Sequence, residues 1–122
     1  MHALVYMIFI MEENKMWRIQ KEKNFDIWES NLCTLKVLHE GNKYRVYVDY
    51  KGYNVVIPMG MYGFEEEIQE RKIKYEVDGK KGVFNSLSYV VEENKLKLFC
   101  NIIFFFLSEH NLDKVLYEEF RY

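Results

Sequence analysis

Positive charge is not concentrated anywhere in this sequence. The chain has 17 Lys and Arg residues against 19 Asp and Glu residues, which gives a formal net charge of -2. The most basic short stretches, 21–23 and 78–81, carry acidic residues alongside the lysines. A protein that follows nucleic acid phosphates gathers Lys and Arg on one face. We therefore expect no nucleic acid partner.

Motifs for catalysis, metal binding and phosphate binding are also missing. Three histidines and two cysteines are present, but none of them falls at the C-x-x-C, H-x-x-x-H or H-E-x-x-H spacing of a metal site. Gly60 and Gly63 form neither a Walker loop nor a dinucleotide fingerprint. His39 and His110 lie where a solvated histidine is ordinary, beside a turn and in a first helical turn. We expect no enzymatic activity, no metal and no cofactor.

The sequence has few of the features of a secreted or membrane-bound protein. Cys33 and Cys100 are far apart and lie in hydrophobic runs, which is typical of buried free thiols. The first residues lack the positive start and small-residue cleavage site of a signal peptide, and Ala3 to Met11 is about half of the roughly 20 residues that span a membrane. We expect a cytoplasmic protein without a membrane partner. Met11 would serve equally well as a start, so residues 1–10 are either an extension or an N-terminal strand.

No Ser-rich or Pro-rich linker interrupts the 122 residues, and the single proline is Pro58. A chain of this length, 49% hydrophobic and 17% aromatic, is enough for one core. The sequence predicts a single domain over 1–122.

Alternation with a period of two residues dominates the middle of the chain. Apolar and polar residues alternate over 34–37 and 45–49, separated by a turn at Gly41 and Asn42. The same pattern predicts a short strand at 55–58, a loop over 59–64, strands over 72–77 and 83–91 joined by a turn at 78–82, and a further turn at 92–95. Residues 12–31 fit either a strand and loop or an irregular helix, and the pattern does not decide between them.

The longest apolar run, residues 96–107, is read in the same way. Its two alternating sets are both apolar in the later half, which is typical of a strand covered on both faces. After it, Ser108 is suited to cap a helix over 109–121 whose apolar residues recur at helical spacing. The predicted class is therefore α+β, with five to seven hairpin-connected strands in a mainly antiparallel, curved sheet packed against a C-terminal amphipathic helix.

Tyrosine is the residue in excess, with ten in the chain. Tyrosine supplies rigid contact area and a polar tip at recognition surfaces, although strand propensity alone also explains tyrosines in a sheet. Acidic residues lie near several of them. The candidate partner-binding residues are Tyr50, Tyr53, Tyr62, Glu65, Glu66, Glu67, Glu118, Glu119 and Tyr122.

Two functions follow from these features. The first is a non-catalytic protein-binding module, of the bacterial immunity or inhibitor type, that occludes a basic protein such as a toxin. The second is a small-molecule-binding protein, or an enzyme with weak sequence signals, with an apolar cavity between a curved sheet and the helix. The residues predicted to line that cavity are Phe99, Phe104, Phe105 and Phe106.

Overall fold

The computed structural model describes residues 16–52 and 57–120, with side chains described up to Ser108. The class is α+β with mainly antiparallel strands, as the sequence predicts, but the structure has eight described strands where five to seven were expected. The described strands are β1 (Trp17–Lys21), β2 (Phe25–Glu29), β3 (Thr34–Glu40), β4 (Lys43–Asp49), β5 (Glu65–Ile68), β6 (Ile73–Val77), β7 (Lys80–Phe84) and β8 (Leu87–Glu92). The helical elements are the short 3-10 turns η1 (Met59–Tyr62) and η2 (Glu93–Lys95) and the long helix α2 (Leu96–Phe120).

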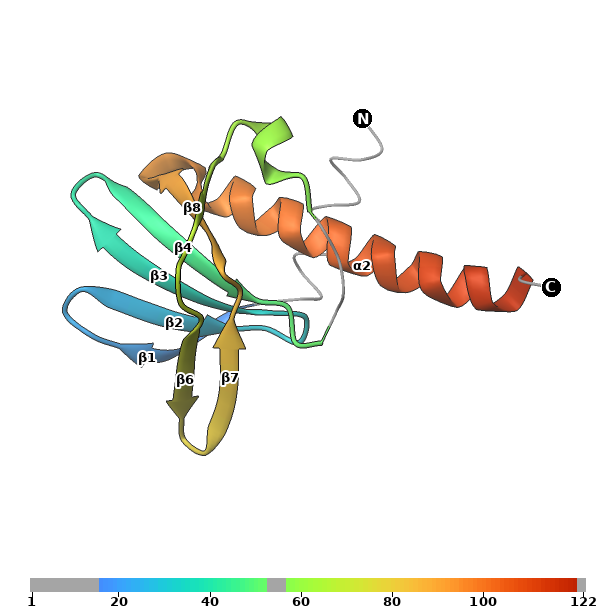
Figure 1. The fold of residues 1–122 in the computed structure, drawn as a ribbon, viewed down its shortest axis with the longest axis horizontal. Coiled ribbons are helices and arrows are strands. Elements are labelled where there is room, and N and C mark those ends of the chain that lie inside the picture. Colours follow the sequence, from blue (N-terminus) through green and yellow to red (C-terminus); the bar gives the residue numbers. More distant parts are fainter. Residues whose placement is uncertain (1–15, 53–56, 121–122) are drawn as a thin grey trace.

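Six strands form one antiparallel sheet in the order β1-β2-β3-β4-β8-β5, and β6 and β7 pair separately as a hairpin. The helix α2 lies on one face of the large sheet and extends beyond it (Figure 1). The β6–β7 hairpin packs against the other face, where Val77 and Phe84 meet Ile27 and Tyr47. The central strands are therefore covered on both sides.

The β3–β4 hairpin forms where the sequence predicts it. The second predicted hairpin is only partly right, because the strand expected over 83–91 is divided between β7, which pairs with β6, and β8, which belongs to the large sheet. Its turn is also shorter than the predicted 78–82, since Val77 already pairs with Lys80. The turn between β3 and β4 contains Gly41 at φ 66°. The turn between β6 and β7 is made by Asp78 at φ 49° and Gly79 at φ 81°, two successive positive φ angles of the kind that a two-residue hairpin loop needs. Residues that tolerate this conformation stand at both turns.

For residues 12–31 the sequence left a strand and loop or an irregular helix open, and the described part of this segment forms strands. β1 and β2 form a third hairpin, with an irregularity in the pairing between Arg18 and Gln20. The predicted strand at 55–58 is not seen in its described part, because Ile57 and Pro58 lead directly into η1. Residues 1–10, for which a strand was one of two expectations, lie outside the described residues.

The prediction for residues 96–107 was wrong. This run is not a strand but the first half of α2, a single helix of 25 residues. Phe99, Ile103 and Leu107 are fully buried against the sheet at a spacing of four residues. Because nearly every residue in the run is apolar, a period of two and a period of 3.6 fit it equally well. Ser108 therefore lies inside the helix and does not cap it.

The main core lies between α2 and the large sheet. From the sheet it receives inward-facing residues of β3, β4 and β8, and from α2 the buried helical residues. These sheet residues are Leu35, Val37, Val46, Val48, Tyr89 and Val91. Within the described part of the chain, no helix combines the length and hydropathy that crossing a membrane requires.

Candidate functional site

The most distinctive surface of the molecule is the η1–β5 surface, which we define by Met61, Tyr62, Glu65, Glu66 and Ile68. β5 is the last strand of the large sheet, and η1 precedes it directly. Met61 and Ile68 are each 84% exposed, and Tyr62 is 50% exposed. Contiguous exposed apolar patches mark binding sites, and these three side chains are the most exposed of the large apolar residues that the structure describes.

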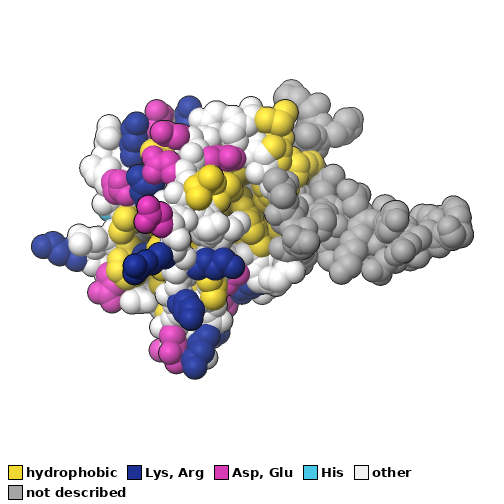
Figure 2. Space-filling view, viewed as in Figure 1, with side chains coloured by type: hydrophobic (Ala, Val, Ile, Leu, Met, Phe, Trp, Pro, Cys, Tyr) yellow, Lys and Arg dark blue, Asp and Glu magenta, His cyan; other side chains and the backbone are white. Residues whose placement is uncertain are grey.

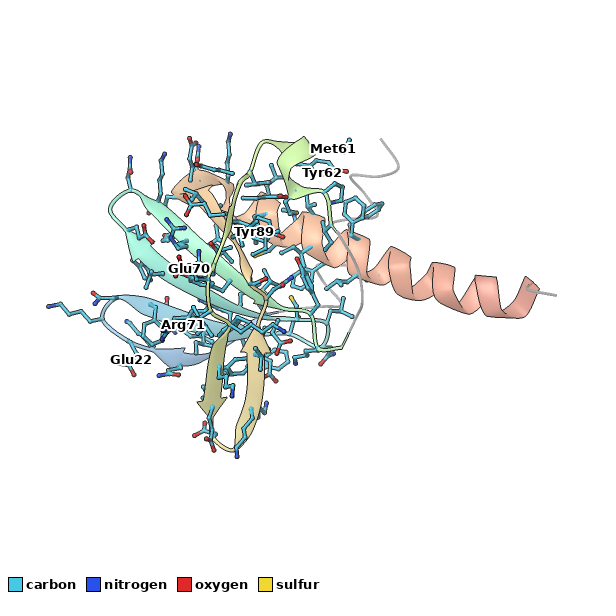
Figure 3. The ribbon with its side chains drawn as sticks, in the orientation of Figure 1. Glu22, Met61, Tyr62, Glu70, Arg71 and Tyr89 are labelled. Carbon is cyan, nitrogen blue, oxygen red and sulfur yellow. The ribbon has the colours of Figure 1, made fainter. Side chains whose placement is uncertain are left out.

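Local structure holds these side chains outward. The turn η1 is anchored by Met59 and Phe64, which are buried, and the ring of Phe64 lies 5.2 Å from that of Phe99 on α2. Gly63 ends the turn at φ 87°, and its N–H donates to the carbonyl of Gly60 at 3.1 Å. Residues between these anchors have to project from the body, as Figure 3 shows for Met61 and Tyr62.

Tyr62 also connects the surface to α2. Its ring centroid lies 6.0 Å from that of Phe106 in an edge-to-face arrangement. The ring of Phe106 in turn lies 5.7 Å from that of Phe105. The tyrosine is thus held by packing while half of it remains available to a partner.

The three consecutive glutamates of β5 differ in their partners. Glu67 pairs with Arg45, whose Nε also donates to Glu40 at 2.7 Å. The hydrogen bonds to Glu40 and Glu67 raise the pKa of Arg45 above its usual value. Glu66 accepts the N–H of Gly60 at 3.0 Å. Glu65 has no ion-pair or hydrogen-bond partner among the described residues, so its charge is uncompensated.

Charge on the surface is therefore acidic and is interrupted by apolar side chains. Residues 59–70 carry four carboxylates and neither Lys nor Arg. In the space-filling view, acidic and hydrophobic side chains reach the surface in the upper half of the molecule, with Lys and Arg side chains among them (Figure 2).

The structure places the predicted partner-binding residues unevenly. Tyr62 lies in η1, and Glu65, Glu66 and Glu67 lie in β5, which follows it in the chain. Glu65 and Glu67 face one side of the strand and Glu66 faces the other. Tyr50 does not belong with them. It is only 8% exposed, and its hydroxyl lies 3.5 Å from that of Tyr89 inside the core. Burial raises the pKa of both tyrosines.

The remaining predicted residues cannot be assigned to the surface. Tyr53 and Tyr122 lie outside the described residues, and so do the side chains of Glu118 and Glu119. Met61 and Ile68, the most exposed apolar residues of the η1–β5 surface, were missed. For Ile68 a signal was present in the sequence, because glutamates stand two residues before it and two residues after it. Met61 gave no such signal, since Met59 precedes it by two residues and Phe64 follows it by three.

The four phenylalanines predicted to line a cavity are divided between core and surface. Phe99 and Phe104 are fully buried, and the ring of Phe99 lies 5.3 Å from Tyr89 as well as 5.2 Å from Phe64. Phe105 and Phe106 are half-buried on α2. The contacts of Phe99 are those of a packed core residue.

Two buried carboxylates that the sequence did not indicate lie elsewhere on the sheet. Glu29 is 7% exposed and lies 2.7 Å from Lys80 Nζ and 3.7 Å from Lys51 Nζ. Asp26 Oδ2 lies 3.4 Å from His39 Nε2. Each carboxylate thus has a basic partner, and no group of three or more His, Cys, Asp or Glu side chains within the described ranges could hold a metal ion.

The thiols are poor nucleophiles in this fold. Cys33 and Cys100 are free. Burial raises the pKa of the Cys33 thiol to about 12, well above its ordinary value of 9.0, and it does the same for Cys100. Because the thiolate is the reactive form, neither cysteine is prepared for attack near neutral pH.

Comparison with known proteins does not assign this chain to a family. No protein family matches the sequence, and neither the curated proteins nor the solved structures contain a significant match.

Proposed function

We propose that this protein binds another protein through the η1–β5 surface and blocks it without catalysing a reaction, as an immunity or inhibitor protein blocks a toxin. The observation that carries the proposal is the exposure of two large apolar side chains, Met61 and Ile68, each 84% exposed, in a stretch of the chain that carries four carboxylates and neither Lys nor Arg. The partner we infer has a basic surface, and the location we infer is the cytoplasm.

Each half of this surface has a physical role in binding. Burial of an exposed Met or Ile side chain contributes about 1.5–3 kcal/mol, so the two together would supply a large part of the energy of a stable complex. Acidic charge complementary to a basic partner accelerates encounter and fixes orientation. Tyr62 adds aromatic contact area at low entropic cost, since Phe106 already restricts its ring.

The experiment begins by capturing the partner. Tagged protein is passed through lysate of the native host, and a stoichiometric captured protein is identified by mass spectrometry and purified. Association and dissociation rates of the pair are then measured at low and high salt for wild type and variants. A native mass spectrum of the protein alone tests the alternative, since a copurified small molecule would favour the cavity.

Two variants probe the surface and one serves as the control. Met61→Ser should increase the dissociation rate about tenfold, which corresponds to about 1.4 kcal/mol. Glu65→Lys should slow association several-fold at low salt, with a smaller effect at high salt. Glu93→Lys makes the same charge change at an exposed glutamate of η2 and should leave both rates within about twofold. Equal rates for all four proteins, or a lysate eluate without a stoichiometric protein, would contradict the proposal.

A further inference from the structure

On the side of β5 away from β8, the main-chain groups have no hydrogen-bond partner among the described residues. The register pairs Glu65 with Val90 and Glu67 with Ser88, and it continues to Gln69, whose N–H donates to the carbonyl of Ser86 at 2.5 Å. In an antiparallel ladder, every second residue directs both main-chain groups to its neighbour strand. Glu65, Glu67 and Gln69 therefore point toward β8. The N–H and C=O groups of Glu66 and Ile68 point away from it.

No described strand occupies that side. β5 ends the order β1-β2-β3-β4-β8-β5. Unpaired groups on an edge strand are a template for another extended segment, and this mode of recognition uses main-chain hydrogen bonds for affinity. The two outward residues offer a partner two donors and two acceptors.

Charge decides which segment fits. A second copy of β5 would bring Glu65 to Glu67 against the same three glutamates, and like charges on opposing strands are destabilising. Residues 1–11 contain no Lys or Arg and are not complementary either. A segment with Lys or Arg opposite the acids is favoured.

We propose that β5 accepts an extended, basic segment of the partner as an additional antiparallel strand at the open edge of the sheet. This inference rests on the proposed function and specifies how the same surface binds. Read from N- to C-terminus, the segment has an apolar residue opposite Ile68, any residue opposite Glu67, and basic residues opposite Glu66 and Glu65. The residue opposite Glu67 does not need to be basic, because Glu67 already forms an ion pair with Arg45.

A synthetic peptide with the central sequence Val-Thr-Lys-Arg, flanked by threonines, is the probe. Binding to the full chain is followed by NMR titration up to millimolar concentration. The control peptide has the same sequence and charge but carries N-methyl groups on Val and Lys, whose N–H groups face β5 in this register. We expect the methylated peptide to bind at least about tenfold more weakly, since two main-chain hydrogen bonds are lost.

Variants of the protein test the same geometry from the other side. Ile68→Pro removes an outward N–H while sparing the bonds to β8, a position that edge strands tolerate. It should weaken peptide binding about tenfold, whereas Ile68→Thr, which keeps the N–H, should weaken it less. Hydrogen exchange of the free protein gives an independent reading, because the amide of Ile68 should exchange rapidly and become protected when the peptide binds.

The outcomes separate this inference from the proposed function. Equal binding of the two peptides, no binding at millimolar concentration, or an Ile68 amide that is already protected in the free protein would overturn strand addition. A captured partner whose affinity falls with Met61→Ser but not with Ile68→Pro would also overturn it, while the proposed function would stand. Loss of affinity with neither variant would overturn both.

Discussion

Replacement of Gly82 by Ala should detach the β6–β7 hairpin from the large sheet. Tyr75 lies directly opposite Gly82 in the hairpin, and its hydroxyl donates to Asp49 Oδ2 at 2.8 Å. A Cβ at position 82 would stand 2.5 Å from that carboxylate oxygen and closer still to Oη and Cζ of Tyr75. Backbone conformation is not the obstacle, since Gly82 is not among the glycines with positive φ. The added methyl group collides with a side chain.

The expected loss in the free energy of unfolding can be worked out from the interactions of Tyr75 that the added methyl group disrupts. A hydrogen bond to a charged group contributes about 1.5–3 kcal/mol, and displacement of the ring also disturbs its contact with Phe84, at 4.6 Å between centroids. Overpacking alone costs about 1–3 kcal/mol. We expect Gly82→Ala to lower the free energy of unfolding by about 2–4 kcal/mol. Tyr75→Phe, which keeps the ring but removes the hydrogen bond, should cost about 1–2 kcal/mol because the residue is partly exposed.

A double-mutant cycle measured by urea unfolding isolates the collision. In a Tyr75→Val background the ring is absent and the close approach to Asp49 Oδ2 remains, so Gly82→Ala should cost about 1–2 kcal/mol less than in the wild type. The cost of the substitution is thus expected to depend on residue 75. A Gly82→Ala cost that is the same in both backgrounds, or below about 0.5 kcal/mol in the wild type, would refute the argument.

Three further predictions concern the core, the pH dependence and the surface charge. Phe99→Ala should lower the free energy of unfolding by about 3–5 kcal/mol in urea titrations, while Leu98→Ala, at a 45% exposed neighbour, should cost less than about 1 kcal/mol. Burial raises the pKa of Cys33 from 9.0 to about 12, so above pH 9 the unfolded state binds fewer protons than the folded state. The free energy of unfolding, measured by urea titration at each pH, should be unaffected below pH 9 and should fall between pH 9 and pH 12. Cys33→Ala should flatten this decline. Arg45→Met should cost about 1–2 kcal/mol on unfolding and, by freeing Glu67, accelerate association with a basic partner at low salt.

The β3–β4 hairpin and the turn between β6 and β7 could be predicted because the residues that specify them lie close together in the sequence. Period-two alternation fixes which residues face the core, and the turns are marked by residues that tolerate positive φ, as at Asp78 and Gly79. The β1–β2 hairpin has a weaker pattern because its pairing slips between Arg18 and Gln20. A bulge changes the alternation within a strand, so a strict period-two search does not detect it.

The helix α2 could not be assigned by periodicity, but its length was informative. From Leu96 the chain runs for 25 residues without proline or glycine, and strands are seldom longer than about ten residues. A strand followed by a helix would need a turn between them, and the sequence around Ser108 contains neither glycine nor proline. Extension of the predicted helix back to Leu96 removes the need for that turn.

The candidate site was predicted by its charge and missed in its apolar part. Acidic clustering near Tyr62 and the acidic residues around Ile68 are visible in the sequence, whereas the exposure of Met61 is a tertiary property. Tyr50 is the opposite case, because it was predicted to be exposed and is buried. A tyrosine next to a turn residue reads as exposed, yet the sheet directs it into the core beside Tyr89. Whether a tyrosine decorates or supports a surface depends on strand register, which a single sequence does not supply.

The positions that hold the fold together and those proposed to bind are carried by different elements. Gly82 and Phe99 act through the hairpin and α2, whereas Glu65 and Ile68 project from the edge strand and contact little of the core. Stability and binding should therefore vary independently. Glu65→Lys should change association by several-fold and the free energy of unfolding by less than about 0.5 kcal/mol. A parallel loss of both would mean that β5 contributes to the core and is not a surface reserved for a partner.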